Sequence, residues 1–312
     1  MNNPGAEAFE RLDGRYETRV LEPSPPAVAE GPWFADDPVA RGEVPAGRRV
    51  VSPVPTGGVS WEELAADDEG LREWCAERWL AGFRRLRPAP ATLVDTRLGL
   101  HRVAEQVISP ARRHANTKIA LRYTRGGFGT PFFGDDVQVR VLADDLIVEQ
   151  AGTERSAKIS TLAAAAEHIG HKLLPDDVEL GDEPLEVDPD ASRFLGDWYG
   201  FACNVLETLR AQAGEAADPS RVQLWAEHFD LAVELGREDA GQRAGYGLSP
   251  GDEHHPEPYA YVVPWVAPTP GELWQATGFP GAELSYAELL DAADQRALVL
   301  QFLSERFAAL TG

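Results

Sequence analysis

Each half of the 312-residue chain contains a stretch with strand periodicity between stretches with helical periodicity. In the first half, apolar residues alternate from 119 to 123 and from 137 to 141, and a further strand is expected around 146 to 150. Residues 221 to 265 return to strand character in the second half. A period of two predicts half-buried strands. Strands grouped in the middle of each half favour antiparallel pairing over a regular series of parallel βαβ units. We therefore expect an α+β fold, with antiparallel β-meanders flanked by amphipathic helices in two sub-domains.

Helix signals bracket both strand regions. Ser60 and Glu63 form a capping box ahead of apolar residues at helical spacing. A second apolar stripe predicts a helix from 97 to 109, which we expect to end at Pro110 because proline lacks the amide donor that a helix interior needs. Three later helices are expected, from 161 to 170, from the Asp188 cap to Gly214, and from the Ser285 and Glu288 capping box with a break near Asp294.

These signals divide the chain into four parts. Residues 1–58 are rich in proline and glycine and predict an irregular arm. An N-terminal α+β module is expected over 59–175 and a C-terminal module over 191–312. Between them, residues 176–190 include eight acids and no base, which is typical of a linker. No internal sequence repeat is apparent.

The charge balance excludes several classes of partner. The chain has 29 basic and 51 acidic residues, a formal net charge of −22 with histidine neutral. Nucleic acid and anionic membrane surfaces repel such a charge, so neither is an expected partner. With no long apolar run and no signal-peptide pattern, the sequence predicts a cytoplasmic protein. Cys75 and Cys203 fall on apolar helical stripes and are expected to stay reduced.

One basic segment interrupts the acidity and forms the first candidate site. Seven bases and one acid lie between Arg97 and Arg125, and the loop that follows is rich in glycine and phenylalanine. Glycine lets backbone amides approach an anion closely, and aromatic rings can cover an apolar group. A second interpretation makes this loop a connection between strands, with its phenylalanines packed on the sheet. The expected ligand-binding residues are Arg112, Arg113, Lys118, Arg122, Arg125, Gly127 and Phe128.

The second candidate site combines histidines and carboxylates from two segments. If residues 228 to 235 form a strand, His228 and Asp230 share its polar face. A second cluster, His254, His255 and Glu257, precedes the apolar strand at 259–263. The two clusters meet only if residues 243–248 form a middle strand, because the resulting meander returns the 249–257 loop beside His228. Imidazoles and carboxylates of this kind bind zinc, iron or manganese. In this hypothesis His228, His254 and His255 hold a divalent transition metal, and Glu257 and Asp230 are catalytic.

The alternative interpretation is that His254 and His255 lie in a proline-rich loop and have no role in binding or catalysis. His228 would then only hydrogen-bond a side chain of a neighbouring strand. Tyr259 and Tyr261 share one face of the next predicted strand, and aromatic strand residues usually pack.

Two segments, GGFGTPFFGDD and SPGDEHHPEPYAYVVPW, resemble a group of uncharacterised actinobacterial proteins. That resemblance spans about residues 97–312 and implies no activity. KIALRYTRGGFG and the following hairpin are also similar to the β-rich C-terminal domain of mycothiol-dependent maleylpyruvate isomerases. Residues 1–96 contain no histidine, so the metal-binding helical half of that family has no counterpart here and the isomerase assignment is not adopted.

Two functions of different classes follow from the sequence. The first is small-molecule binding, with a metal-assisted hydrolase or isomerase site in which the metal makes a bound water acidic. The alternative is a non-catalytic interaction or scaffold protein whose basic segment at 97–125 docks an acidic surface, its own or a partner's.

Overall fold

The computed structural model describes residues 85–116, 119–124, 126–130, 137–150, 153–170 and 180–312. It also describes two short parallel strands, β1 (Val51–Ser52) and β2 (Val59–Ser60). The rest of the predicted arm, most of the helix predicted from Ser60, and Cys75 lie outside the described residues. So do Lys118 and Arg125 of the expected ligand-binding set.

The first described helix continues through Pro110. α4 (Leu93–Val103) leads into a π-helical turn, η2 (Ala104–Ile108), and then into α5 (Ser109–Asn116). In the π-helical turn the backbone N–H of Ser109 donates to the carbonyl of Ala104. Because the regular i→i−4 ladder is already interrupted there, the next residue can lack an amide donor. The predicted helix end at Pro110 is therefore wrong.

Five antiparallel strands form the first sheet, in the order β3-β4-β5-β6-β7. Three of them confirm predicted strands: β3 (Arg122–Thr124), β5 (Val137–Leu142) and β6 (Asp145–Gln150). Two were not expected: β4 (Gly127–Gly129) and β7 (Thr153–Lys158). The glycines of β4, Gly127 and Gly129, suggest a turn in the sequence. In the structure they let β4 lie close to β5, because a β-carbon at either position would collide with the β5 backbone. The predicted helix at 161–170 is confirmed as α6 (Leu162–Ile169).

A long helix opens the second half. α7 (Pro189–Ala213) begins after the predicted cap Asp188, whose side chain accepts from the N–H groups of Asp190 and Ala191. A second antiparallel sheet follows in the order β12-β11-β10-β9-β8. Its strands are β8 (Gln223–Trp225), β9 (Asp230–Leu235), β10 (Ala244–Ser249), β11 (Tyr259–Pro264) and β12 (Ala282–Ser285). The Ser285 capping box and the break near Asp294 are confirmed in α8 (Tyr286–Asp291) and α9 (Gln295–Thr311).

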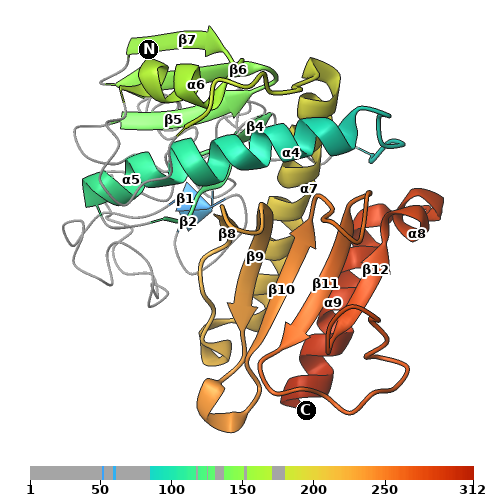
Figure 1. The fold of residues 1–312 in the computed structure, drawn as a ribbon. Coiled ribbons are helices and arrows are strands. Elements are labelled where there is room, and N and C mark those ends of the chain that lie inside the picture. The colour runs from blue at the N-terminus through green and yellow to red at the C-terminus, as the bar shows by residue number, and fades with distance from the viewer. Residues whose placement is uncertain are drawn as a thin grey trace, which may run out of the picture.

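The two halves repeat one order of elements, which the sequence does not reveal. Each has a helix, a five-stranded antiparallel meander and a closing helical segment. They meet at equivalent places, because Leu121 beside β3 and Leu224 in β8 exchange two backbone hydrogen bonds of 2.7 and 2.9 Å. The buried apolar side chains of both halves join one hydrophobic cluster. The predicted α+β fold with antiparallel meanders is confirmed, and Figure 1 shows the two sheets with α4 crossing between them.

The second sheet has one apolar face and one polar face. Leu231, Val233, Tyr246 and Val262 are buried on the face that packs on α7 and α9, where Tyr246 contacts Phe307 of α9. In Figure 1 these two helices lie behind the sheet, and no helix of the described residues covers its front. We call that front the helix-free face. Its residues are Asp230, Ala232 and Glu234 on β9, Gly245, Gly247 and Ser249 on β10, Tyr259, Tyr261 and Val263 on β11, and Glu283 on β12.

Candidate functional site

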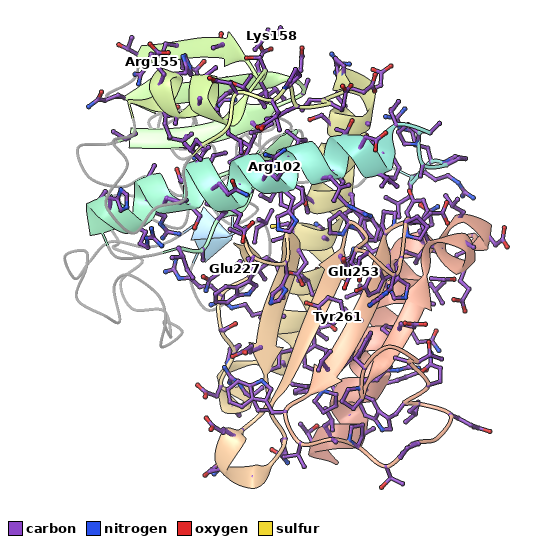
Figure 2. The ribbon with its side chains drawn as sticks, in the orientation of Figure 1. Arg102, Arg155, Lys158, Glu227, Glu253 and Tyr261 are labelled. Atoms are coloured by element: carbon purple, nitrogen blue, oxygen red, sulfur yellow. The ribbon has the colours of Figure 1, made fainter. Side chains whose placement is uncertain are left out.

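Polar groups gather where the helix-free face approaches α4. β9 and β11 begin at this end of the sheet, and β10 and β12 finish at it. Figure 2 shows Glu227 and Glu253 at this end and Tyr261 lower on the same sheet. The predicted middle strand is confirmed as β10, so the meander does bring the 249–257 loop to the end of the sheet that carries Asp230.

Asp230 is the buried carboxylate of this site. It is the first residue of β9 and only 4% exposed. One of its oxygens, Oδ2, accepts a hydrogen bond from the Tyr261 hydroxyl, while Oδ1 is buried with no hydrogen-bond partner. Burial raises the pKa of Asp230, although the Tyr261 hydroxyl and the nearby His228 oppose that rise. The residue before it, Phe229, has a positive φ of 57° and stacks on His101 of α4 at 5.2 Å. A non-glycine residue in this region is uncommon, so the turn is held by its surroundings.

Tyr261 reaches Asp230 across an intervening strand. Tyr261 on β11 lies opposite Gly247 on β10, and β9 is on the far side of β10. A β-carbon at Gly247 would collide with the Cζ and hydroxyl of Tyr261. The ring therefore lies over the glycine, and this is what lets the phenol contact Asp230.

A second carboxylate, Asp252, organises the loop between β10 and β11. It accepts hydrogen bonds from the N–H groups of His254 and His255, at 2.7 and 2.8 Å, and from the Tyr259 hydroxyl at 2.6 Å. Burial by itself would raise the pKa of Asp252, but these hydrogen bonds outweigh burial and hold the pKa at about 2. Asp252 therefore stays ionised and fixes the backbone of this loop.

His255 lies between two carboxylates. Its Nδ1 is 3.1 Å from Asp252 Oδ1, and its Nε2 is 3.5 Å from Glu283 Oε2. The ring also packs on Tyr259, with centroids 4.4 Å apart. The ring contacts continue from there: Tyr261 lies 6.0 Å from Tyr259 on the same strand and 6.4 Å from Phe279 in the loop between β11 and β12. We call His255, Tyr259, Tyr261 and Phe279 the aromatic row.

Arg97 of α4 also holds the loop between β10 and β11, through hydrogen bonds to its backbone carbonyls. Its guanidinium donates to the carbonyls of Pro250, Asp252, His255 and Pro256 at 2.9–3.3 Å. The residue is 4% exposed, and burial lowers its pKa. This basic residue, expected within a ligand-binding or docking segment, therefore has a structural role inside the protein.

Arg97→Ala is expected to destabilise the protein by roughly 2–4 kcal/mol, because it leaves several buried carbonyl groups without a donor. Urea denaturation followed by tryptophan fluorescence measures the change. Arg102→Ala is the matched control, since Arg102 is exposed on the same helix and should alter stability by less than about 0.5 kcal/mol. Equal effects of the two substitutions would contradict the role given to Arg97.

The three predicted metal ligands do not form a cluster. β9 starts at Asp230, so His228 is an exposed turn residue, and His254 is exposed beside Glu253 at 3.5 Å. His255 precedes β11, two strands from β9, and such strands lie about 10 Å apart. One metal ion needs its ligands about 2 Å away. Among the residues that the structure describes, no three His, Cys, Asp or Glu side chains are grouped so that they could hold a metal ion.

The two predicted catalytic carboxylates have different surroundings. Asp230 is buried in the site, but Glu257 is exposed, and its charge acts on the buried Tyr286 of α8. The residues that complete the site are Tyr259, Tyr261, Asp252 and Glu283. Only the shared face of the two tyrosines signals it in the sequence, and it is also the pattern of ordinary sheet packing.

The basic segment is largely used inside the fold. Arg112 and Arg122 are buried and donate to the backbone carbonyls of Ala120 and Tyr123, while Arg113 is exposed. Phe128 in β4 is 1% exposed and packs against Phe229 at 5.0 Å. Gly127 is the close-approach glycine of the same strand. This arrangement favours the interpretation of the loop as sheet structure over an anion pocket.

Comparisons with models of protein families, with curated proteins and with solved structures found no match for this chain. No helix among the described residues is long and apolar enough to cross a membrane.

Proposed function

We propose that this protein binds a small molecule on the helix-free face of the second sheet, around Asp230 and Tyr261. The observation that carries the proposal is the buried Asp230 oxygen, Oδ1, which has no hydrogen-bond partner although the residue is 4% exposed. A buried polar atom without a partner costs about 1–3 kcal/mol, and more when it is charged. A ligand that donates a hydrogen bond to this oxygen would recover that cost.

The surroundings of Asp230 support a binding role. Tyr261 is half-buried and places its ring beside the carboxylate, so a ligand can gain both a hydrogen bond and an aromatic contact. Asp252 and Arg97 hold the adjoining loop in one conformation, which reduces the entropy lost on binding. Asp230 can also accept a proton from a bound ligand, because its raised pKa makes it a better base than an ordinary aspartate.

A metal-assisted reaction needs a group of metal-ligating side chains, and the described residues contain no such group of three or more. The scaffold alternative depends on free basic side chains, but Arg97, Arg112 and Arg122 are buried and donate to backbone carbonyls. Small-molecule binding without a protein-bound metal is the function that the geometry supports best.

A thermal-shift screen tests this function. Wild-type protein and Asp230→Asn would be screened against a panel of cationic, neutral and anionic small molecules at 0.15 M salt. At least one compound is expected to raise the melting temperature of the wild type and to lose that effect in the variant. If every compound acts equally on both proteins, Asp230 is not part of a binding site and the proposal fails.

A further inference from the structure

Asp230 is one of two carboxylates on the helix-free face with an unpartnered oxygen. Glu283 on β12 is the other: its side chain is 27% exposed, and its Oε2 is buried without a hydrogen bond. The nearest basic group is His255 Nε2 at 3.5 Å, which forms an ion pair only when the imidazole is protonated. Two carboxylates therefore each have a buried oxygen that accepts no hydrogen bond.

The Tyr261 side chain lies between these two carboxylates. Tyr261 lies directly opposite Glu283 on the neighbouring strand and donates to Asp230 on its other side. The faces of aromatic rings attract cations, and carboxylate oxygens form strong hydrogen bonds with N–H donors of cations. An anion would be repelled here, and a neutral ligand would leave both carboxylates uncompensated.

The spacing of the two carboxylates selects the shape of the ligand. Asp230 lies on β9 and Glu283 on β12, with β10 and β11 between them. Three interstrand steps separate their backbones by about 14 Å. A compact cation can satisfy only one of the two, whereas a linear molecule with a cationic group at each end can satisfy both.

We infer that the ligand of this face is a linear polyamine, with one ammonium group on Asp230, another on Glu283, and its methylene chain across Tyr261. This inference rests on the proposed binding function. Gly247 carries no side chain that would collide with the Tyr261 ring, so this ring can lie over the sheet between the two carboxylates, where the methylene chain would contact it. The concentration of acids in residues 175–312, 26 against seven bases, attracts polycations toward this half of the chain.

Isothermal titration calorimetry at 0.15 M salt tests the inference with three probes: spermidine, the monoamine butylamine, and the neutral 1,8-octanediol. Spermidine is expected to bind at least about ten-fold more tightly than butylamine, because a second charge-assisted hydrogen bond is worth about a factor of ten or more. Octanediol is expected not to bind. Asp230→Asn and Glu283→Gln should each weaken spermidine binding by about ten-fold or more.

Glu253→Gln is the matched control for general charge attraction. Glu253 is 85% exposed in the adjoining loop, so its loss should change spermidine affinity by less than about two-fold. Equal affinity of spermidine and butylamine, no spermidine binding, or an equal loss in the Glu253 variant would each overturn the polyamine inference. The proposed function would survive these results if another compound of the screen bound in an Asp230-dependent way, and would fail with it if none did.

Discussion

Asp230→Asn is expected to raise the stability of the unliganded protein at pH 7 by about 1 kcal/mol, or roughly 2–4 °C in melting temperature. The substitution removes a buried negative charge and keeps an oxygen that can accept from Tyr261. The same change should abolish ligand binding. A gain in stability together with a loss of binding is what distinguishes a functional buried carboxylate from a structural one.

The pH dependence of this effect has a defined sign. Burial raises the pKa of Asp230 in the folded protein above the value of about 3.9 expected in the unfolded chain. The folded state therefore holds the proton more tightly, and wild-type stability falls as pH rises from about 4 through the folded-state pKa. The asparagine variant lacks this loss, so its advantage should be largest at pH 7 and should vanish near pH 4.

Asp252→Asn supplies the control of opposite sign. The pKa of Asp252 is lowered to about 2, so its ionised form contributes stability above about pH 4, and that contribution is lost as pH falls toward 2. Its variant should be less stable than wild type at pH 7. Melting curves from pH 3 to pH 8 measure both variants. A destabilised Asp230→Asn protein at pH 7 would show that the carboxylate has a compensating partner and would remove the main support for the site.

Gly247→Ala is expected to destabilise the protein by about 2–3 kcal/mol. The added methyl group occupies the space of the Tyr261 ring, so the phenol must leave Asp230, and overpacking and the lost hydrogen bond both contribute. Gly245 provides a matched control on the same strand and the same face. A β-carbon there meets only the Val263 carbonyl at 3.9 Å, so Gly245→Ala should change stability by less than about 0.5 kcal/mol.

A double-mutant cycle identifies the cause of the Gly247 effect. If the collision with Tyr261 is responsible, Tyr261→Ala should remove most of the cost of Gly247→Ala, and the coupling energy should be about 1 kcal/mol or more. Urea denaturation of the four proteins gives this coupling. Additive effects of the two substitutions would mean that the glycine is required by the backbone and not by the ring.

Local patterns predict much of the fold. Period-two alternation and the other strand signals predict β5, β6 and β9 to β11, and the capping signals at Asp188 and Ser285 mark real helix starts. These predictions succeed because helix caps and strand alternation depend on neighbouring residues. β4 and the helix through Pro110 do not follow from such patterns. In both, a tertiary or π-helical arrangement outweighs the usual preference of glycine or proline.

The candidate site was only partly predictable. Asp230 and His255 were expected to act, and the confirmed middle strand β10 does return the 249–257 loop to the end of the sheet that bears Asp230. The metal site expected at His228, His254 and His255 was not supported, because no three possible ligands are grouped among the described residues, and His228 lies in an exposed turn. The roles of Asp252, Glu283 and Tyr261 depend on contacts across several strands, which no local pattern records.

Composition and contacts between near neighbours are enough to predict the α+β class, the acidic character and many of the helix and strand bounds. The roles of the charged residues depend on how the chain packs. The tertiary structure buries Arg97, Arg112 and Arg122 against backbone carbonyls and leaves Asp230 and Glu283 each with an unpartnered oxygen. The physical reason is that the cost of a buried charge is set by the groups around it, and these come from strands and helices far apart in the chain.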